Sequence, residues 1–181
     1  MEFAIDTLIE DEIVLLLCRS KALKNTNLDL VMELTGHGYY VVMLSVTLPY
    51  TVLAKAYQGR NIDLTRVYVI DTVTRYSKGS GSESGDFASF ISNPGNLTEM
   101  GVEISSALNK VDDCEICLVI DDISTMLLYS SSAMVSRFIH FIANKLRLHE
   151  SRGVFVAVEN GLDPALKTQL STFTDSVHIL E

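Results

Sequence analysis

Two segments of the chain carry residues that could act on a phosphorylated ligand. The apolar run of residues 117–120 is followed by Asp121 and Asp122. A carboxylate directly after a buried strand is typical of the acid that orients magnesium in nucleotide-hydrolysing α/β domains. Such domains also hold the phosphates in a glycine-rich loop that ends in Lys and Ser or Thr. Whether a nucleotide can bind therefore depends on the segment after the first apolar run.

That second segment, residues 18–27, contains no glycine. Glycines let successive backbone N–H groups converge on an anion, because they adopt positive φ without strain. Lys24 supplies positive charge and Thr26 a hydroxyl, so a rebuilt anion site for ATP is one interpretation. The other is a polar strand-to-helix turn with solvated lysines. We expect the second, because charge without converging amides binds phosphate weakly.

The two acids also allow two interpretations. Asp121 could orient magnesium-bound water, with Asp122 beside it, if ATP and Mg²⁺ were bound. Alternatively, both carboxylates could accept hydrogen bonds from nearby backbone and hydroxyl groups, since Ser124 and Thr125 follow closely. We expect the structural role, and we predict no catalytic residue, no resident cofactor and no metal site.

The remaining reactive residue types form no recognisable site. Cys114 and Cys117 have redox-pair spacing but precede a strand beside acids, so we expect core cysteines. No second Cys or His pair completes a zinc site, and the four histidines are scattered. Four basic residues lie close together in the sequence: Arg137, Lys145, Arg147 and Arg152. They indicate either a solvated helix face or a surface that is complementary to an acidic partner or to a second copy of the chain.

The elements that must position these residues alternate along the chain. Six continuously apolar runs predict strands at 13–18, 40–46, 67–71, 117–121, 154–159 and 176–180. Helical patterns with recognisable ends lie between them, at about 28–35, 49–59, 96–111, 135–149 and 163–173. Asn96 with Glu99, Asp163 before a proline, and the serines at 130–132 are expected caps. We therefore predict a three-layer α/β fold, with a largely parallel sheet of about six strands and helices on both faces.

Length and composition set the class of protein. The 181 residues suffice for one domain, 1–181, and the Gly/Ser-rich stretch 76–86 is expected to be a flexible loop within it. The net charge of −9 disfavours nucleic acid and anionic membranes. No apolar run reaches the roughly 20 residues of a membrane span. The odd number of cysteines and the acidic start without a signal sequence favour the cytoplasm.

Several sequence segments, in the same order along the chain, resemble those of the RecA/KaiC-like ATPase superfamily, especially its archaeal branch close to KaiC. They are residues 40–45, residues 61–64 leading into 67–71, and residues 118–129. The resemblance covers nearly the whole chain and implies a RecA-like P-loop NTPase topology. In active relatives, the strand ends form a cleft for ATP, often between subunits. This chain departs from that pattern at the glycine-free segment and at Val46-Thr47-Leu48, where the resemblance implies a catalytic glutamate.

We therefore expect a degenerate, non-catalytic member: a regulatory or accessory protein-interaction module that self-associates or docks on an active relative. The alternative is a divergent ATPase that binds the nucleotide through Lys24, Thr26, Asp121 and Asp122. A third class, nucleic-acid binding through the Gly/Ser loop, is disfavoured by the negative charge and by the single lysine of that loop, Lys78.

Overall fold

The computed structural model describes residues 12–79, 81, 85–111 and 113–180. Within them, seven strands form one sheet in the order β4-β3-β2-β5-β6-β1-β7, and all the neighbouring strands run parallel. The strands are β1 (Ile13–Cys18), β2 (Tyr40–Ser45), β3 (Val67–Asp71), β4 (Ala88–Phe90), β5 (Ile116–Ile120), β6 (Arg152–Val158) and β7 (Ser176–Ile179).

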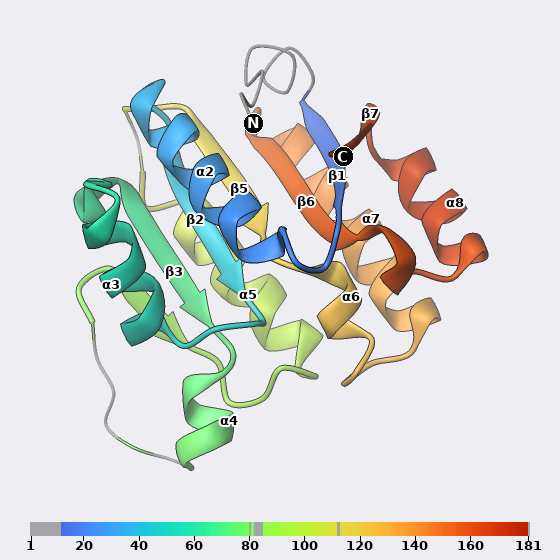
Figure 1. The fold of residues 1–181 in the computed structure, drawn as a ribbon, viewed down its shortest axis with the longest axis horizontal. Coiled ribbons are helices and arrows are strands. Elements are labelled where there is room, and N and C mark those ends of the chain that lie inside the picture. The colour runs from blue at the N-terminus through green and yellow to red at the C-terminus, as the bar shows by residue number, and fades with distance from the viewer. Residues whose placement is uncertain (1–11, 80, 82–84, 112, 181) are drawn as a thin grey trace.

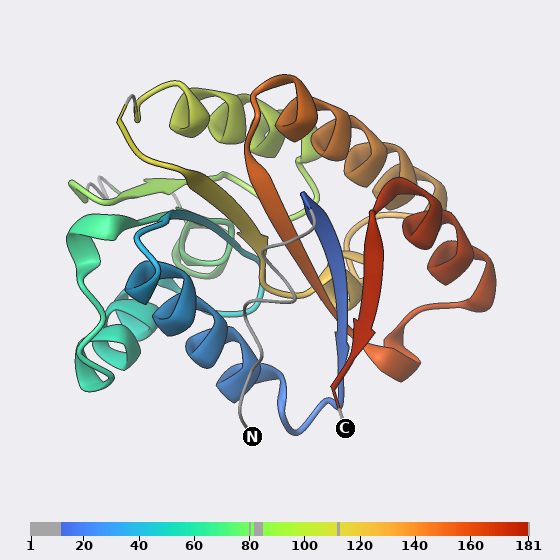
Figure 2. The same ribbon diagram turned by 90° about the horizontal axis from the view of Figure 1, so that it is seen from above.

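Helices cover both faces of this sheet, as Figures 1 and 2 show. On one face lie α2 (Leu23–Gly36) and α3 (Tyr50–Gly59), and on the other lie α5 (Leu97–Leu108), α7 (Ser132–Leu148) and α8 (Pro164–Phe173). Two short helices, α4 (Thr74–Lys78) and α6 (Ile123–Met126), follow β3 and β5 at the carboxyl edge of the sheet. The predicted three-layer α/β fold is confirmed.

Strand β1 explains why the apolar runs do not alternate with polar residues. All six of its residues are buried. Ile13, Leu15 and Leu17 pack into the core under α5, α7 and α8. Val14, Leu16 and Cys18 pack into the core under α2 and α3. Because both faces of a parallel sheet are covered by helices, every position of a central strand must be apolar.

The sequence patterns located the long elements and missed the short ones. All six predicted strands and five predicted helices are present, with ends shifted by a few residues. Strand β4, at the sheet edge beside β3, was not predicted, because three residues cannot establish a periodicity. Helices α4 and α6, of five and four residues, were not predicted for the same reason.

The stretch 76–86 was predicted to be a flexible loop. Its first three residues, 76–78, belong to α4, and Gly79 ends this helix with a φ of +83°. Glycine adopts such a positive φ without the steric penalty that a Cβ would bring. Residues 80 and 82–84 of the predicted loop lie outside the described residues.

The three expected caps are confirmed. The Asn96 side chain accepts a hydrogen bond from Glu99 N at 3.1 Å, Asp163 accepts one from Leu166 N at 2.9 Å, and Ser131 accepts one from Met134 N at 3.3 Å. Each cap satisfies a backbone donor that the first turn would otherwise leave unpaired. Among the described helices, none combines the length and the apolar character that crossing a bilayer requires.

Candidate functional site

Three buried carboxylates lie at the carboxyl edge of the sheet, where relatives of this topology bind their ligands. Asp71 ends β3, and Asp121 and Asp122 directly follow β5; none is more than 3% exposed. Buried charges must be paired or hydrogen-bonded. The partners of these three acids therefore decide what the edge can do.

Asp121 is bound by the last residue of β2 and by the loop that follows it. Its Oδ1 accepts a hydrogen bond from Val46 N at 2.9 Å. Its Oδ2 accepts from Ser45 Oγ at 3.0 Å, Thr47 N at 3.2 Å and Thr47 Oγ1 at 2.5 Å. Burial raises the pKa of Asp121 to about 6, and these hydrogen bonds oppose that rise. The carboxylate therefore joins the ends of two neighbouring strands.

Asp122 and Asp71 make the same local structure. Asp122 accepts hydrogen bonds from Ser124 N, Thr125 N and Thr125 Oγ1, and so caps α6. Asp71 accepts hydrogen bonds from Val73 N, Thr74 N and Thr74 Oγ1 at the start of α4. It also accepts one from Tyr50 N at 2.7 Å. Each acid is followed three residues later by a threonine, a signal from which the role of Asp71 could have been predicted. Both acids hold the following chain segment in place.

The glycine-free segment forms a tight turn. Ala22 N donates to Arg19 O at 2.9 Å, and α2 begins at Leu23. Only four residues therefore separate β1 from α2, whereas a phosphate loop occupies eight. The described residues with positive φ are Gly38, Asn61, Gly79 and Glu150, all outside this turn. The turn thus lacks the alternation of right- and left-handed residues that forms an anion-binding nest.

Lys24 and Thr26, the two predicted anion ligands of the alternative reading, lie in different environments. Lys24 is exposed on the first turn of α2, whereas Thr26 is buried. Thr26 forms a hydrogen bond with Cys18 that partly offsets the rise in the thiol pKa caused by burial. Lys24 and Asp121 line the same cavity between α2 and α3, and Asp122 and Thr26 are absent from its lining. Thr26 and Asp122 instead both lie beside Cys18.

The cysteines are free thiols with unequal surroundings. Cys18 and Cys117 are buried, as expected, and burial raises the pKa of Cys117 to about 12. The expectation that Cys114 is a core residue is wrong: it is exposed, because it lies in the bend before β5. Within the described part of the chain, no three His, Cys, Asp or Glu side chains are grouped so that they could hold a metal ion.

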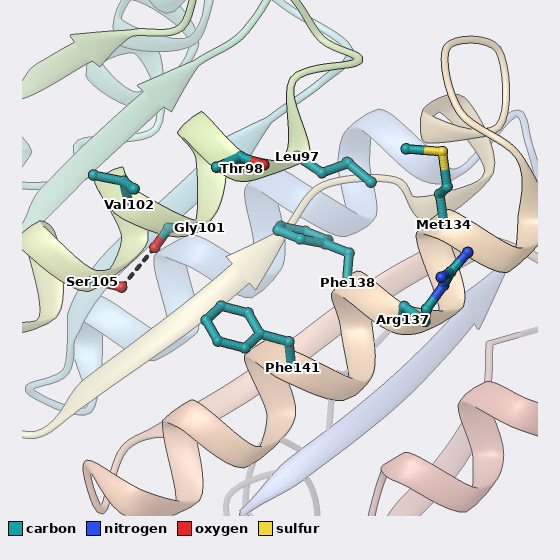
Figure 3. Close-up of a pocket in the computed structure, with 9 residues that line it drawn as sticks. All are labelled: Leu97, Thr98, Gly101, Val102, Ser105, Met134, Arg137, Phe138 and Phe141. Carbon is teal, nitrogen blue, oxygen red and sulfur yellow. Dashed lines mark hydrogen bonds between the residues drawn. The ribbon is translucent and has the colours of Figure 1, made fainter.

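A groove of about 630 Å³ runs between α5 and α7, on the opposite face of the sheet from α2 (Figure 3). Its lining consists of Leu97, Thr98, Gly101, Val102 and Ser105 from α5, and Met134, Arg137, Phe138 and Phe141 from α7. In Figure 3, the rings of Phe138 and Phe141 project from α7 toward α5. Phe138 is 6% exposed, whereas Phe141 is 52% exposed. The groove thus has a buried base and an exposed apolar rim.

The groove was not predicted from the sequence. The core stripe of α7 includes Phe138, but Phe141 lies three residues farther on and outside that stripe. A large aromatic residue outside the core stripe of an amphipathic helix is the signal that could have located this surface. Gly101 of α5 lies directly opposite the Phe141 ring, since a Cβ there would be in van der Waals contact with it at 3.4 Å.

The predicted basic group is divided by the fold. Arg147 forms a salt bridge of 2.8 Å with Asp175 on the α8 side, and the Arg152 guanidinium lies 6.0 Å from the Tyr39 ring centroid. Arg137 lines the groove, and Lys145 Nζ lies 5.9 Å from the centroid of the Phe141 ring. Two of the four cations therefore flank the exposed aromatic ring at its i−4 and i+4 positions.

Solved structures with the same architecture come from the archaeon Pyrococcus horikoshii. A KaiC-like protein superposes with a TM-score of 0.64 at 13% identity, over 93% of this chain and 70% of that one. An uncharacterized protein in complex with an unknown peptide superposes with a TM-score of 0.60 at 14% identity, over 92% of this chain and 76% of that one. The predicted RecA/KaiC-like fold is therefore confirmed.

Comparison with curated proteins gave no match. The model of one protein family matches residues 16–178, which include every strand except part of β1 and part of β7. This chain therefore belongs to the family of unknown function DUF7504.

Proposed function

We propose that this chain is a non-catalytic RecA/KaiC-like domain that works as a regulatory or accessory protein-interaction module. The observation that carries the proposal is the groove between α5 and α7, with its half-exposed aromatic rim. Val102, Met134 and Phe141 are 61%, 46% and 52% exposed and line one hollow. Contiguous apolar side chains of this kind mark surfaces that another molecule covers.

The carboxyl edge of the sheet supports the non-catalytic part of the proposal. The Asp121 carboxylate accepts four hydrogen bonds from the protein itself, three of them on one oxygen. An oxygen with three donors has little capacity left for a magnesium-bound water. The divergent-ATPase alternative needs Lys24 and Thr26 at one phosphate, yet one is exposed and the other is buried beside Cys18.

The shape of the groove favours an amphipathic helix as its occupant. Two adjacent helices form its walls, and the apolar lining follows their length, as in grooves that receive the apolar face of a third helix. Arg137 and Lys145 flank Phe141, so a partner carrying carboxylates beside its apolar stripe is complementary.

Another protein fits this surface better than a second copy does. Two copies related by a two-fold axis would bring the same face together, and Arg137 and Lys145 of each copy would approach those of the other. An acidic helix from a partner meets no such repulsion. The peptide complex formed by the second Pyrococcus horikoshii neighbour is consistent with a peptide-binding role for this fold.

The proposal is tested by methyl NMR with two designed helical peptides. Both carry the same apolar stripe; one is flanked by glutamates and the other by lysines. We expect the glutamate peptide to shift the Met134 methyl resonance saturably, with a Kd below about 100 μM, and the lysine peptide to bind at least about fivefold more weakly. Met32 of α2, on the opposite face, serves as an internal reference that stays unmoved.

Two matched variants on α7 locate the binding surface. Phe141→Glu should abolish the Met134 shift, whereas Leu148→Glu, at an 88% exposed position outside the groove, should leave it unchanged. Equal binding to both variants, or a response at Met32 instead of Met134, refutes the groove as the docking surface. A concentration-dependent dimer seen by light scattering, and lost in Phe141→Glu, would show that a second copy of this chain occupies the groove and would refute the proposed acidic partner.

A further inference from the structure

A second hollow lies on the α2–α3 face of the sheet, away from the docking groove. It has a volume of about 210 Å³ and lies between α2, α3 and strand β2. Leu28, Met43 and Leu53 supply apolar walls, and each is buried. The exposed residues Ser20 and Lys24 also belong to the lining, so the cavity opens to solvent beside the turn between β1 and α2.

Two side chains that line this cavity each carry one polar atom without a hydrogen-bond partner. Asn27 is 8% exposed and Tyr57 is 1% exposed, and both line the hollow. Asn27 Oδ1 and Tyr57 OH have no hydrogen-bond partner among the described residues. Only four buried side-chain N or O atoms of the described residues lack a partner, and two of the four belong to residues that line this one cavity. Buried polar atoms without partners are costly, and their concentration at one place points to a missing ligand.

The orientation of the Asn27 amide is fixed by a second contact. Its Nδ2 donates to the main-chain oxygen of Asp121 at 2.9 Å. Exchanging the amide N and O would bring two acceptors together, so the unpartnered atom of Asn27 is an acceptor. It requires a hydrogen-bond donor. Tyr57 can either donate to the occupant or accept from it.

Water alone fits the cavity poorly. One water occupies about 30 Å³ of liquid volume, so the space would take several, and each needs two to four polar partners. Most of the lining is apolar, including Leu23, Leu48 and Ala56. A mostly apolar hollow with a few converging polar groups is the usual form of a small-molecule site.

We propose that this cavity binds a small neutral organic molecule with an apolar body and an amide-like head. The head donates a hydrogen bond to Asn27 Oδ1 and forms a second one with the Tyr57 hydroxyl, while the body packs between α2 and α3. The proposal extends beyond the docking function, because the cavity and the groove lie on opposite faces of the sheet.

The charge of the lining explains why the head is neutral. Lys24 lies at the exposed opening and Asp121 in the buried wall. An anionic head beside Asn27 and Tyr57 would therefore lie near the like charge of Asp121 and would meet the acceptor of Asn27. A cationic head would lose its hydration shell without gaining a carboxylate oxygen, since the Asp121 oxygens already accept four hydrogen bonds. A neutral amide offers both a donor and an acceptor.

The site is tested with three fragments of nearly the same shape: benzamide, benzoate and benzylammonium. Binding is followed at pH 7.5 through the methyl resonance of Met43, which lines the cavity, with Met100 on the opposite face as reference. For a ligand of ~9 non-hydrogen atoms, we expect benzamide to bind with a Kd at or below about 1 mM. We expect benzoate and benzylammonium to bind at least about tenfold more weakly.

Three variants separate the site from the general surface. Tyr57→Phe removes the hydroxyl but keeps the ring, and should weaken benzamide binding at least about fivefold. Ala56→Leu fills the hollow and should abolish binding, while Tyr50→Phe, outside the lining, should leave it unchanged. Absence of saturable benzamide binding, equal affinity in Tyr57→Phe, or tighter binding of either charged fragment overturns the proposal. The proposal is also overturned if a crystal soaked in benzamide shows only ordered water in this cavity.

Discussion

The side-chain amide of Asn27 donates a hydrogen bond of 2.9 Å to the main-chain oxygen of Asp121, 94 residues away in the chain. This bond ties α2 to the carboxyl end of β5. It lies beside the loop after β2, which Asp121 holds through its side chain. Asn27 and Asp121 together therefore connect a helix and two strands at the edge of the sheet.

Asn27→Ala is expected to destabilise the fold by about 1–3 kcal/mol, because a buried hydrogen bond is lost and a carbonyl oxygen loses a partner. Urea denaturation measures the change in the free energy of unfolding. Asn25→Ala is the matched control, since Asn25 is exposed on the same helix, and it should stay within about 0.5 kcal/mol of wild type. Equal effects of the two substitutions would show that the Asn27 contact is energetically neutral.

Asp121 is expected to make stability depend on pH. Its pKa in the fold is raised to about 6 by burial, above the ordinary value of 3.8. The folded state therefore binds a proton more tightly than the unfolded state does. The resulting stabilisation is fully present below pH ~4 and is lost as the pH rises through ~6, amounting to about 3 kcal/mol.

The measurement compares wild type with Asp121→Asn between pH 4 and 7. Other acids titrate equally in both proteins, so the difference in unfolding free energy isolates this carboxyl. The unfolding free energy of wild type minus that of the variant should fall as the pH rises across that range. A difference in unfolding free energy that stays constant with pH would contradict the raised pKa of Asp121. An Asp121 carboxyl resonance that titrates near pH 4 would contradict it too.

ATP with Mg²⁺ is expected not to bind saturably at concentrations up to about 1 mM, because the turn between β1 and α2 lacks converging amides. Isothermal titration calorimetry on wild type checks this expectation. Lys24→Ala is the companion variant, since its exposed side chain can be removed without disturbing the core. Micromolar binding by wild type that disappears in Lys24→Ala would favour the divergent ATPase over the docking module.

Gly161→Ala is expected to destabilise the fold by about 1–3 kcal/mol through overpacking. A Cβ at this position would lie 2.6 Å from Ser124 Oγ and 2.7 Å from Ser124 Cβ. The same Ser124 hydroxyl accepts a hydrogen bond of 3.0 Å from Val158 N, so the shift would also disturb the contact between α6 and β6.

The matched control for that substitution is Gly36→Ala. Gly36 closes α2, has no heavy atom within 4 Å of a built Cβ, and keeps a negative φ. Alanine there should stabilise the protein by about 0.5–1 kcal/mol, because glycine loses more backbone entropy on folding. Thermal unfolding of the two variants should therefore shift in opposite directions; shifts of the same sign would be inconsistent with the packing described around Gly161.

Local signals predicted those parts of the fold that depend on neighbouring residues. Asn96, Ser131 and Asp163 cap helices through contacts three residues ahead, which a sequence displays directly. Asp122 likewise binds groups two and three residues ahead, as its structural interpretation required. Asp121 differs, because its partners lie at the end of β2 and in the loop after it, 74 to 76 residues earlier in the chain, and so depend on the strand order.

The two hollows could not be predicted for a related reason. The groove requires α5 and α7 to lie side by side, and the cavity requires α2 and α3 to do so, which only the sheet order specifies. Tyr57 illustrates the limit: its spacing from Leu53 indicates an inward helix face, as observed. Nothing in that spacing indicates that its hydroxyl lacks a partner.

The two outermost strands of the sheet are also its shortest, with three residues in β4 and four in β7. A neighbouring molecule could add only a few main-chain hydrogen bonds at either border, too few to extend the sheet stably. Assembly by strand addition is therefore disfavoured at both borders. Among the described residues, the helical layers therefore offer the larger surface for a lasting association, through side chains such as those that line the groove between α5 and α7.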